Sequence, residues 1–393
     1  MDELVYETAR RLIAFDTVSS NSDLPAAEFL GNLLEGAGFR TTLHKFQIGS
    51  TSHANLVASA GPPREGGLII SGHIDTVPFE GQPGWTRDPL VMEIGDERIY
   101  GRGTSDMKGF LAQCVAAAHQ IERARLKRPL VFVLTASEEV GCLGAAYVGP
   151  ALETILDAIP VPRLAWIGEP TSNAVCHLHK SIVAFDIVVH GRGGHSGAPA
   201  RGVNAIAVMG KVLECIGRLQ AERAEATDPR YTEVFPDAPT DVLNVGTISG
   251  GIALNMIAEE CKLRVSYRSL PDADPLALYH EATRRISAIN LHDYALGEHP
   301  ATLLISPPMV VPPLNSPRKT ALEAALFDVT GTSTSGGAVF GTDGGWFERS
   351  GINSLICGPG DFVQAHQPNE SISRAAFERG SDLILRVIDR MCC

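Results

Sequence analysis

The stretch Gly67-Leu68-Ile69-Ile70-Ser71-Gly72-His73-Ile74-Asp75 begins with apolar residues and ends with a histidine and an aspartate. Its apolar part predicts a β-strand over 67–72, and the run Leu130-Val131-Phe132-Val133-Leu134 predicts another over 130–135. Both runs are nearly continuous in apolar residues, which is typical of central strands that are covered on both faces. The sequence therefore predicts an α/β fold with a central sheet flanked by helices.

The segments around these strands continue the α/β pattern. Apolar residues at helical spacing predict helices over 3–16 and 25–37, and Pro25 suits the first turn of the second helix. The remaining predicted elements are strands over 54–60, 164–167 and 353–357, and helices over 107–122, 318–328 and 372–391.

The pattern changes in the middle of the chain, near residue 177. A strand over 182–189, a helix over 203–219, strands over 241–248 and 259–267 and a helix over 273–289 follow one another there. This order is typical of an α+β unit of the split βαβ, ferredoxin-like kind. A chain of 393 residues is also longer than a single domain with one hydrophobic core usually is. We therefore expect a catalytic domain formed by residues 1–176 and 289–393, interrupted by an inserted domain over 177–288.

The composition narrows the class of function. The formal charge of −12 argues against nucleic acid, because phosphates require a basic face. No apolar run approaches the ~18 residues of a membrane span, and the acidic start Met1-Asp2-Glu3-Leu4 lacks the pattern of a secretory signal. The scattered cysteines form no CxxC pair, which favours a reducing compartment. We expect a cytoplasmic protein that binds a small molecule and neither nucleic acid nor membranes.

Histidines and acids recur where the predicted strands end. Taken singly, each has an ordinary explanation, since a Glu-Glu pair is usually solvated surface charge. Together they are informative, because sites in open α/β sheets form outside the carboxyl ends of the strands. Histidine and carboxylate without thiolate is the ligand set expected for catalytic zinc, with manganese or cobalt as alternatives. The residues concerned are His73, Asp75, Asp106, Glu138, Glu139, Glu169 and, in a later segment, His366.

These segments resemble the zinc-dependent deacylase and exopeptidase family that contains acetylornithine deacetylase, succinyl-diaminopimelate desuccinylase, aminoacylase and glutamate carboxypeptidases. The motifs occur in the family's order over essentially the whole chain. A narrower likeness to acetylornithine deacetylase and its acetylcitrulline-using relatives is carried by residues 200–206, 250–257 and 358–366. The resemblance implies a zinc-exopeptidase-like catalytic domain with an inserted lid and dimerisation domain.

The resemblance also implies a centre of two zinc ions, or of cobalt or manganese. In it, Asp106 bridges the metals, His73 and Glu169 complete one site, and Glu139 and His366 complete the other. Asp75 lies two residues beyond His73 on the same side of an extended segment, so it can hold the second imidazole nitrogen. The family pattern further implies a cis peptide between Asp106 and Met107.

Glu138 is the residue that we expect to act as general base and acid. In an extended segment it points away from Glu139, so one carboxylate can bind metal while the other meets a water shared by the two metals. Glu138 then takes the proton of this water and returns it to the leaving amine. The expected reaction is hydrolysis of N2-acetyl-L-ornithine to L-ornithine and acetate, a step of arginine biosynthesis.

The inserted domain is expected to contribute further residues. The segment 191–197 resembles the family's lid motif, in which His195 stabilises the oxyanion, often from the partner subunit of a homodimer; a glycine-rich hairpin with an incidental histidine is the alternative. Asn255 and Arg268 match a substrate-holding pair. Thr342 lies in a segment that resembles a substrate-pocket loop, where Asp343-Gly344 departs from the usual Thr-Glu-Ala and leaves the substrate's side chain open.

Several other functions remain open on the sequence. An N-acetylcitrulline deacetylase, a succinyl-diaminopimelate desuccinylase, a dipeptidase or a carboxypeptidase could use the same scaffold with another pocket. A catalytically silent, metal-bound binding protein belongs to a different class, and the complete ligand set with Glu138 argues against it. Amide hydrolysis by cysteine is disfavoured because no cysteine stands beside a histidine in a recognisable nucleophile setting.

Overall fold

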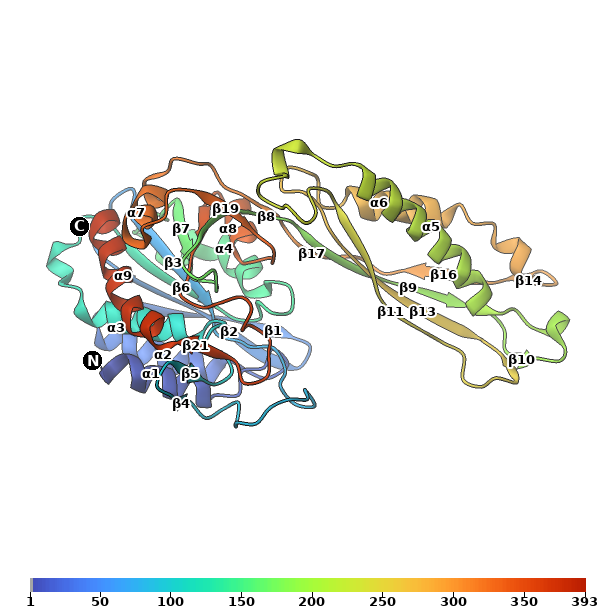
Figure 1. Cartoon of the computed structure of the whole chain (residues 1–393), viewed down its shortest axis with the longest axis horizontal. Coiled ribbons are helices and arrows are strands. Elements are labelled where there is room, and N and C mark those ends of the chain that lie inside the picture. Colours follow the sequence, from blue (N-terminus) through green and yellow to red (C-terminus); the bar gives the residue numbers. More distant parts are fainter. Residues whose placement is uncertain (1–2) are drawn as a thin grey trace. The chain divides into compact units, whose positions relative to one another are not determined.

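The computed structural model describes residues 3–393. The chain divides into two compact units, the first formed by residues up to Leu178 together with Leu314–Cys393, and the second by His179–Pro313 (Figure 1). No helix among the described residues is both long and apolar enough to cross a membrane. The cysteines of this part of the chain are free thiols.

A mixed sheet forms the centre of the first unit, which confirms the predicted α/β fold. Its middle strands β6, β3, β7 and β20 are neighbours in that order and run parallel. The sheet continues with antiparallel strands at both sides. In sheet order its strands are β1 (Arg40–Ile48), β2 (Thr51–Ala60), β6 (Leu130–Thr135), β3 (Leu68–His73), β7 (Leu164–Ile167), β20 (Asn353–Ile356), β8 (Val175–His179) and β18 (Leu314–Asn315), with β19 (Ser335–Ala338) beside β8.

Helices cover both faces of this sheet (Figure 1). Leu68 and Ile70 of β3 point into one core cluster and Ile69 into the other, because side chains alternate along a strand. This double burial explains the continuous apolar run. The first cluster is shared with α1 (Glu3–Ala14), α2 (Leu24–Gly36), α3 (Lys108–Gln120), α7 (Ala321–Thr330) and α9 (Arg374–Cys392), and the second with α4 (Leu143–Leu156) and α8 (Gly344–Arg349).

A small three-stranded sheet joins distant parts of the first unit. Strand β5 (Arg98–Tyr100) pairs with β4 (Glu93–Ile94) on one side and with β21 (Ser371–Ser373) on the other. The pairing of β5 with β21 fixes the segment after residue 100 beside the segment before residue 371. Both segments carry residues of the predicted metal site.

The second unit is an antiparallel sheet packed against two helices. The strand order is β11-β13-β9-β16, and the chain order strand-helix-strand-strand-helix-strand is that of a split βαβ unit. Its elements are β9 (Ile182–His190), β10 (Gly194–His195), α5 (Ala205–Glu225), β11 (Val242–Gly250), β12 (Met256–Ile257), β13 (Glu260–Arg268), α6 (Ala277–Ser287), β14 (Ala295–Leu296), β15 (His299–Pro300), β16 (Thr302–Ile305) and β17 (Met309–Val311).

The second unit extends further than the range 177–288 that the sequence suggested. Strands β16 and β17 both pair with β9, so residues up to Pro313 belong to this unit and not to the catalytic domain. The physical reason is that β9 has a free edge after pairing with β13, and these late strands satisfy its backbone groups.

Candidate metal centre and active site

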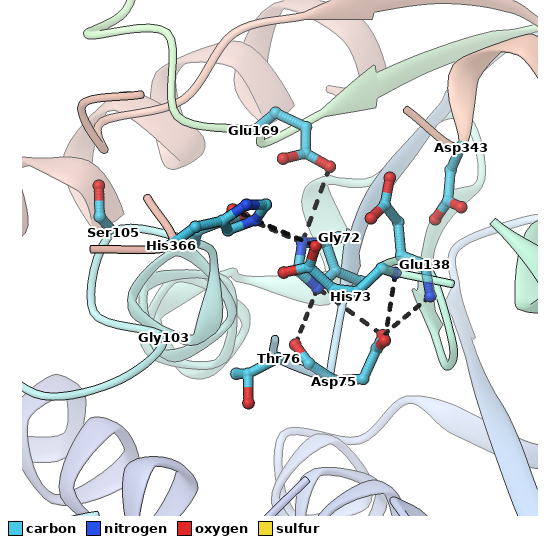
Figure 2. Close-up of polar contacts among 12 residues, drawn as sticks. Gly72, His73, Asp75, Thr76, Gly103, Ser105, Glu138, Glu169, Asp343 and His366 are labelled. Atoms are coloured by element: carbon cyan, nitrogen blue, oxygen red, sulfur yellow. Dashed lines mark hydrogen bonds and ion pairs between the residues drawn. The ribbon is translucent and has the colours of Figure 1, made fainter. Parts of the chain in front are cut away.

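The carboxyl ends of the four parallel strands carry most of the candidate residues. Strand β3 ends at His73, and the residues after β6 and β7 include Glu139 and Glu169. The segment after β20 leads to His366, while Asp106 lies two residues before the start of α3. Because neighbouring parallel strands end at the same edge of a sheet, these side chains meet there (Figure 2).

Asp106 lies between the two histidines. Its Oδ1 is 3.0 Å from Nε2 of His73, and its Oδ2 is 3.3 Å from Nε2 of His366. Each histidine also has a second carboxylate, since Glu169 Oε1 lies 3.8 Å from His73 and Glu139 Oε2 lies 3.1 Å from His366. This arrangement has one shared carboxylate and two flanking pairs of one histidine and one acid. His73, Asp106 and Glu169 are buried, whereas His366 is exposed and leaves the site open to solvent.

The concentration of acids at this edge shifts the pKa values of the site. Burial raises the pKa of the Glu169 and Glu138 carboxyls well above their usual range, and it raises that of Glu139 as well. Burial alone would lower the pKa of His73, but the hydrogen bond with Asp106 and the negative charge of Glu169 raise it by more. The pKa of His73 therefore lies well above its usual value. Buried carboxylates that lie this close together are stabilised in their ionised form by a nearby positive charge.

The donor set fits divalent metal ions. The ligand atoms of His73, Asp106 and Glu139 lie within 4.8 Å of one another, and so do those of His73, Glu138 and Glu169. All are imidazole nitrogens or carboxylate oxygens, which suit zinc, manganese or cobalt. The carboxylates that crowd this edge supply the negative charge that such ions need.

The contacts of the Asp75 carboxylate differ from those that the sequence predicted. Nδ1 of His73 lies 3.0 Å from the backbone oxygen of Asp75 and 3.8 Å from its carboxylate. The carboxylate instead accepts the backbone N–H groups of Glu138 and Glu139 at 3.0 and 3.2 Å (Figure 2). It also accepts the hydroxyl of Ser19 at 2.6 Å. Asp75 therefore holds the imidazole through its main chain and the Glu138–Glu139 segment through its side chain.

Glu370 holds the Asp106 segment in place, a role that sequence reasoning missed. Its Oε1 accepts the backbone N–H groups of Gly103, Ser105 and Asp106 at 2.9–3.1 Å. Its Oε2 accepts Nη1 of Arg102 at 2.9 Å, and both side chains of this ion pair are 1% exposed. The signal was present in the sequence, because Glu370 stands four residues after His366 in the same motif.

Arg102 and Gln82 extend this network to the His366 segment. Arg102 Nη2 donates to Oε1 of Gln82 at 2.8 Å, and Nε2 of Gln82 donates to the backbone oxygen of His366 at 2.7 Å. His366 itself has a left-handed φ of 62°, a conformation that needs support from its surroundings. The peptide between Asp106 and Met107 is cis, as the resemblance implied.

The second unit brings two of its three candidate residues together and separates the third. His195 in β10 pairs with Met256, and the N–H of Ser196 donates to the backbone oxygen of Asn255 at 3.1 Å. Asn255 and His195 are both exposed. Arg268 ends β13, whose first residue Glu260 lies near Asn255 in the chain. At ~3.3 Å per residue the strand separates Arg268 from that end by roughly 26 Å.

Thr342 occupies a buried turn of the first unit. The residue is fully buried, and its hydroxyl accepts the N–H of Gly344 at 3.1 Å. In this bond the hydroxyl only accepts, so its own O–H can still donate, and the expected contact of Thr342 with substrate stays a prediction. Its neighbour Asp343 is also buried and lies beside Glu138 (Figure 2).

An edge of parallel strands with two histidines around a shared carboxylate defines a metal-dependent α/β hydrolase. The sequence profile of peptidase family M20/M25/M40 matches residues 69–390, and the chain belongs to this family. An acetylornithine deacetylase of Erwinia tasmaniensis is 35% identical over 395 residues, which cover 98% of this chain and 97% of that protein. The protein is thus a metal-dependent amidohydrolase of this family.

Solved structures share the fold at lower sequence identity. The M20 family metallo-carboxypeptidase Sso-CP2 from Sulfolobus solfataricus has a TM-score of 0.80 at 17% identity, with 99% of both chains covered. The YXEP protein of Bacillus subtilis, a dinuclear metal binding peptidase from the M20 family, has a TM-score of 0.63 at 15% identity, with 98% of this chain and 96% of that chain covered. At these identities the likeness shows the fold alone.

Proposed function

We propose that the protein hydrolyses the N-acyl amide of a small amino acid, with N2-acetyl-L-ornithine as substrate and L-ornithine and acetate as products. This reaction would place it in arginine biosynthesis. The observation that carries the proposal is the position of Asp106 between His73 and His366, with the Glu138 carboxylate beside them. The 35% identity with an acetylornithine deacetylase over 98% of the chain supports the choice of substrate.

We propose that five side chains of the first unit hold two metal ions, with zinc as the ion best suited to them. When bound, such ions polarise the amide carbonyl and lower the pKa of water. The proposed ligands are His73, Asp106, Glu139, Glu169 and His366.

Glu138 is the proposed general base and acid. Its carboxylate lies with the ligand atoms of His73 and Glu169, within 4.8 Å, so it can reach a water at the centre. It takes the proton of the attacking water and returns it to the amine that leaves. The bonds from Asp75 to the N–H groups of Glu138 and Glu139 hold this segment while the proton moves.

A homodimer is proposed to complete the site. A small substrate cannot touch both Asn255 and Arg268 of one copy, because β13 separates them by roughly 26 Å. We propose that His195 and Asn255 of one copy and Arg268 of the other serve the same substrate, with His195 on the oxyanion and Arg268 on the α-carboxylate. The exposed edge strand β11, which carries Ile248 at 52% exposure, supports pairing between copies.

A substrate panel on the zinc-loaded protein tests the proposal. N2-acetyl-L-ornithine should give a higher kcat/KM than N-acetyl-L-citrulline, N-succinyl-diaminopimelate or dipeptides, and removal of metal by a chelator should abolish turnover until zinc is restored. Faster cleavage of a dipeptide would assign the same centre to a peptidase. A metal-loaded protein without turnover on the whole panel would instead indicate a binding protein.

A further inference from the structure

A second cluster of ligand-type side chains lies beside the proposed metal centre. Glu138, Cys142 and Asp343 place one ligand atom each within 4.8 Å of one another. Sγ of Cys142 lies 3.2 Å from Oε1 of Glu138, and Figure 2 shows the carboxylates of Glu138 and Asp343 side by side. Cys142 stands at the start of α4 and Asp343 directly before α8, so two helix ends fix the cluster.

Oδ1 of Asp343 has no hydrogen-bond partner outside this cluster among the described residues. Asp343 is 1% exposed, and its Oδ2 accepts the hydroxyl of Thr135 at 2.5 Å. Its Oδ1 is buried and has no hydrogen-bond partner outside the cluster among the described residues 3–393. A buried carboxylate oxygen without a partner is costly, because it has lost its water and gained nothing in return. The cluster thus has capacity for a further positive ligand.

The distances within the cluster suit a tetrahedral ion. Zinc takes thiolate sulfur at about 2.3 Å and carboxylate oxygen at about 2.0–2.2 Å, which places ligand atoms roughly 3.5 Å apart. The separation of 3.2 Å between Sγ and Oε1 is close to this value, and the limit of 4.8 Å for the whole set allows the small adjustment that remains.

We propose that Cys142, Asp343 and Glu138 form a third zinc site of lower affinity, whose occupation stops turnover by engaging Glu138. The inhibition rests on the proposed role of Glu138 as base, whereas the site itself rests only on the cluster. When zinc binds, the S–H bond of Cys142 breaks, its proton passes to water, and a Zn–S bond forms without any change in oxidation state. Three protein ligands and a thiol that must lose its proton make this site weaker than the proposed pair.

Zinc itself is the probe. The protein with two zinc equivalents is dialysed against rising free zinc, and bound metal, turnover and zinc K-edge X-ray absorption are followed together. The proposed centre holds only nitrogen and oxygen ligands, so sulfur at about 2.3 Å from zinc reports on the third site alone. We expect a third equivalent to bind, sulfur to enter the zinc shell, and turnover to fall in parallel with occupancy.

Two variants remove ligands and one serves as control. Cys142→Ser and Asp343→Asn should each lower the affinity for the third zinc ion by about tenfold or more, and raise the free zinc concentration that inhibits turnover by the same factor. The turnover of each variant is compared with its own turnover at two zinc equivalents. Cys215→Ser, the control, removes a partly exposed thiol of α5 and should change neither the binding of the third zinc ion nor the inhibition. Either of the first two variants suffices if the other fails to fold.

The outcomes separate this proposal from the proposed function. Absence of a third equivalent, or sulfur scattering that persists in Cys142→Ser, overturns the site. A third zinc that binds through Cys142 without slowing turnover overturns the inhibition, whereas the role of Glu138 as base is decided by substitution of Glu138 itself. A protein with no turnover on any substrate defeats the proposed function, but binding and X-ray absorption still decide whether the site exists.

Discussion

The candidate residues of the two units are held in different ways. In the first unit, bonds from Asp75 and Glu370 fix the backbone on both sides of the centre, and most of the ligands are buried. In the second unit, His195 and Asn255 are exposed, and Arg268 lies at the other end of a strand. The candidate ligands of the first unit are therefore held in an ordered cluster, whereas two candidate residues of the second unit, His195 and Asn255, lie on its surface.

The largest expected effect concerns the first unit alone. Glu138→Gln removes the proton acceptor but keeps its shape, so turnover should fall by about 10³-fold or more. Zinc content and thermal stability should stay close to those of the unchanged protein, and Glu153→Gln on the exposed side of α4 serves as control. Retained turnover in the zinc-loaded variant would remove Glu138 from its role.

A smaller effect is expected when the second unit loses its histidine. His195→Ala should lower kcat by about 10²-fold, which is the usual loss of one oxyanion donor. Zinc content should not change, because His195 lies in the other unit. His299→Ala, also exposed in that unit, is the control. Equal kcat in both variants would favour the alternative that His195 is incidental to its hairpin.

A third prediction concerns the support of the metal centre. Glu370→Ala leaves three backbone N–H groups and Arg102 without their acceptor, so the affinity for zinc should fall by about 10–100-fold. Glu370→Gln keeps one acceptor oxygen and should lose less. Zinc retained against a competing chelator gives the measurement, and equal retention in Ala and Gln variants would reduce Glu370 to a packing role.

A fourth prediction concerns the recovery of part of the turnover in a mixed homodimer. Asn255→Ala and Arg268→Ala should each be nearly inactive as pure proteins. If the two residues serve one site from different copies, mixing the two variants at equal amounts should restore about a quarter of full turnover, because half of the dimers are mixed and each has one intact site. No recovery after exchange of subunits would contradict the shared site and return both residues to a single copy.

The sequence predicted which side chains of the first unit meet because the signals for them are local. Strands β3, β6 and β7 are short apolar runs that end at a histidine or near an acid, and parallel pairing alone brings such ends together. The distance between Asn255 and Arg268 could also be predicted from the sequence, because a predicted strand over 259–267 lies between them.

Other features depend on contacts that no local pattern reveals. The Asp75 carboxylate binds the backbone of Glu138, 63 positions away, and nothing near Asp75 indicates that partner. Strands β16 and β17 are short and lie among prolines, so their pairing with β9 and the true end of the second unit at Pro313 were missed. Helix α4 was missed as well.

The order of the ligands along the chain has a consequence for synthesis. His73, Asp106, Glu139 and Glu169 precede the second unit, and His366 follows it. A ribosome that adds ~5–20 residues per second needs roughly 10–40 seconds to reach His366 after Glu169, with the whole second unit made in between. During that interval the nascent chain carries four of the five proposed ligands but lacks His366, together with α7, α8, β20 and α9 of the first unit. A chain that stops before His366 therefore lacks one of the five proposed ligands.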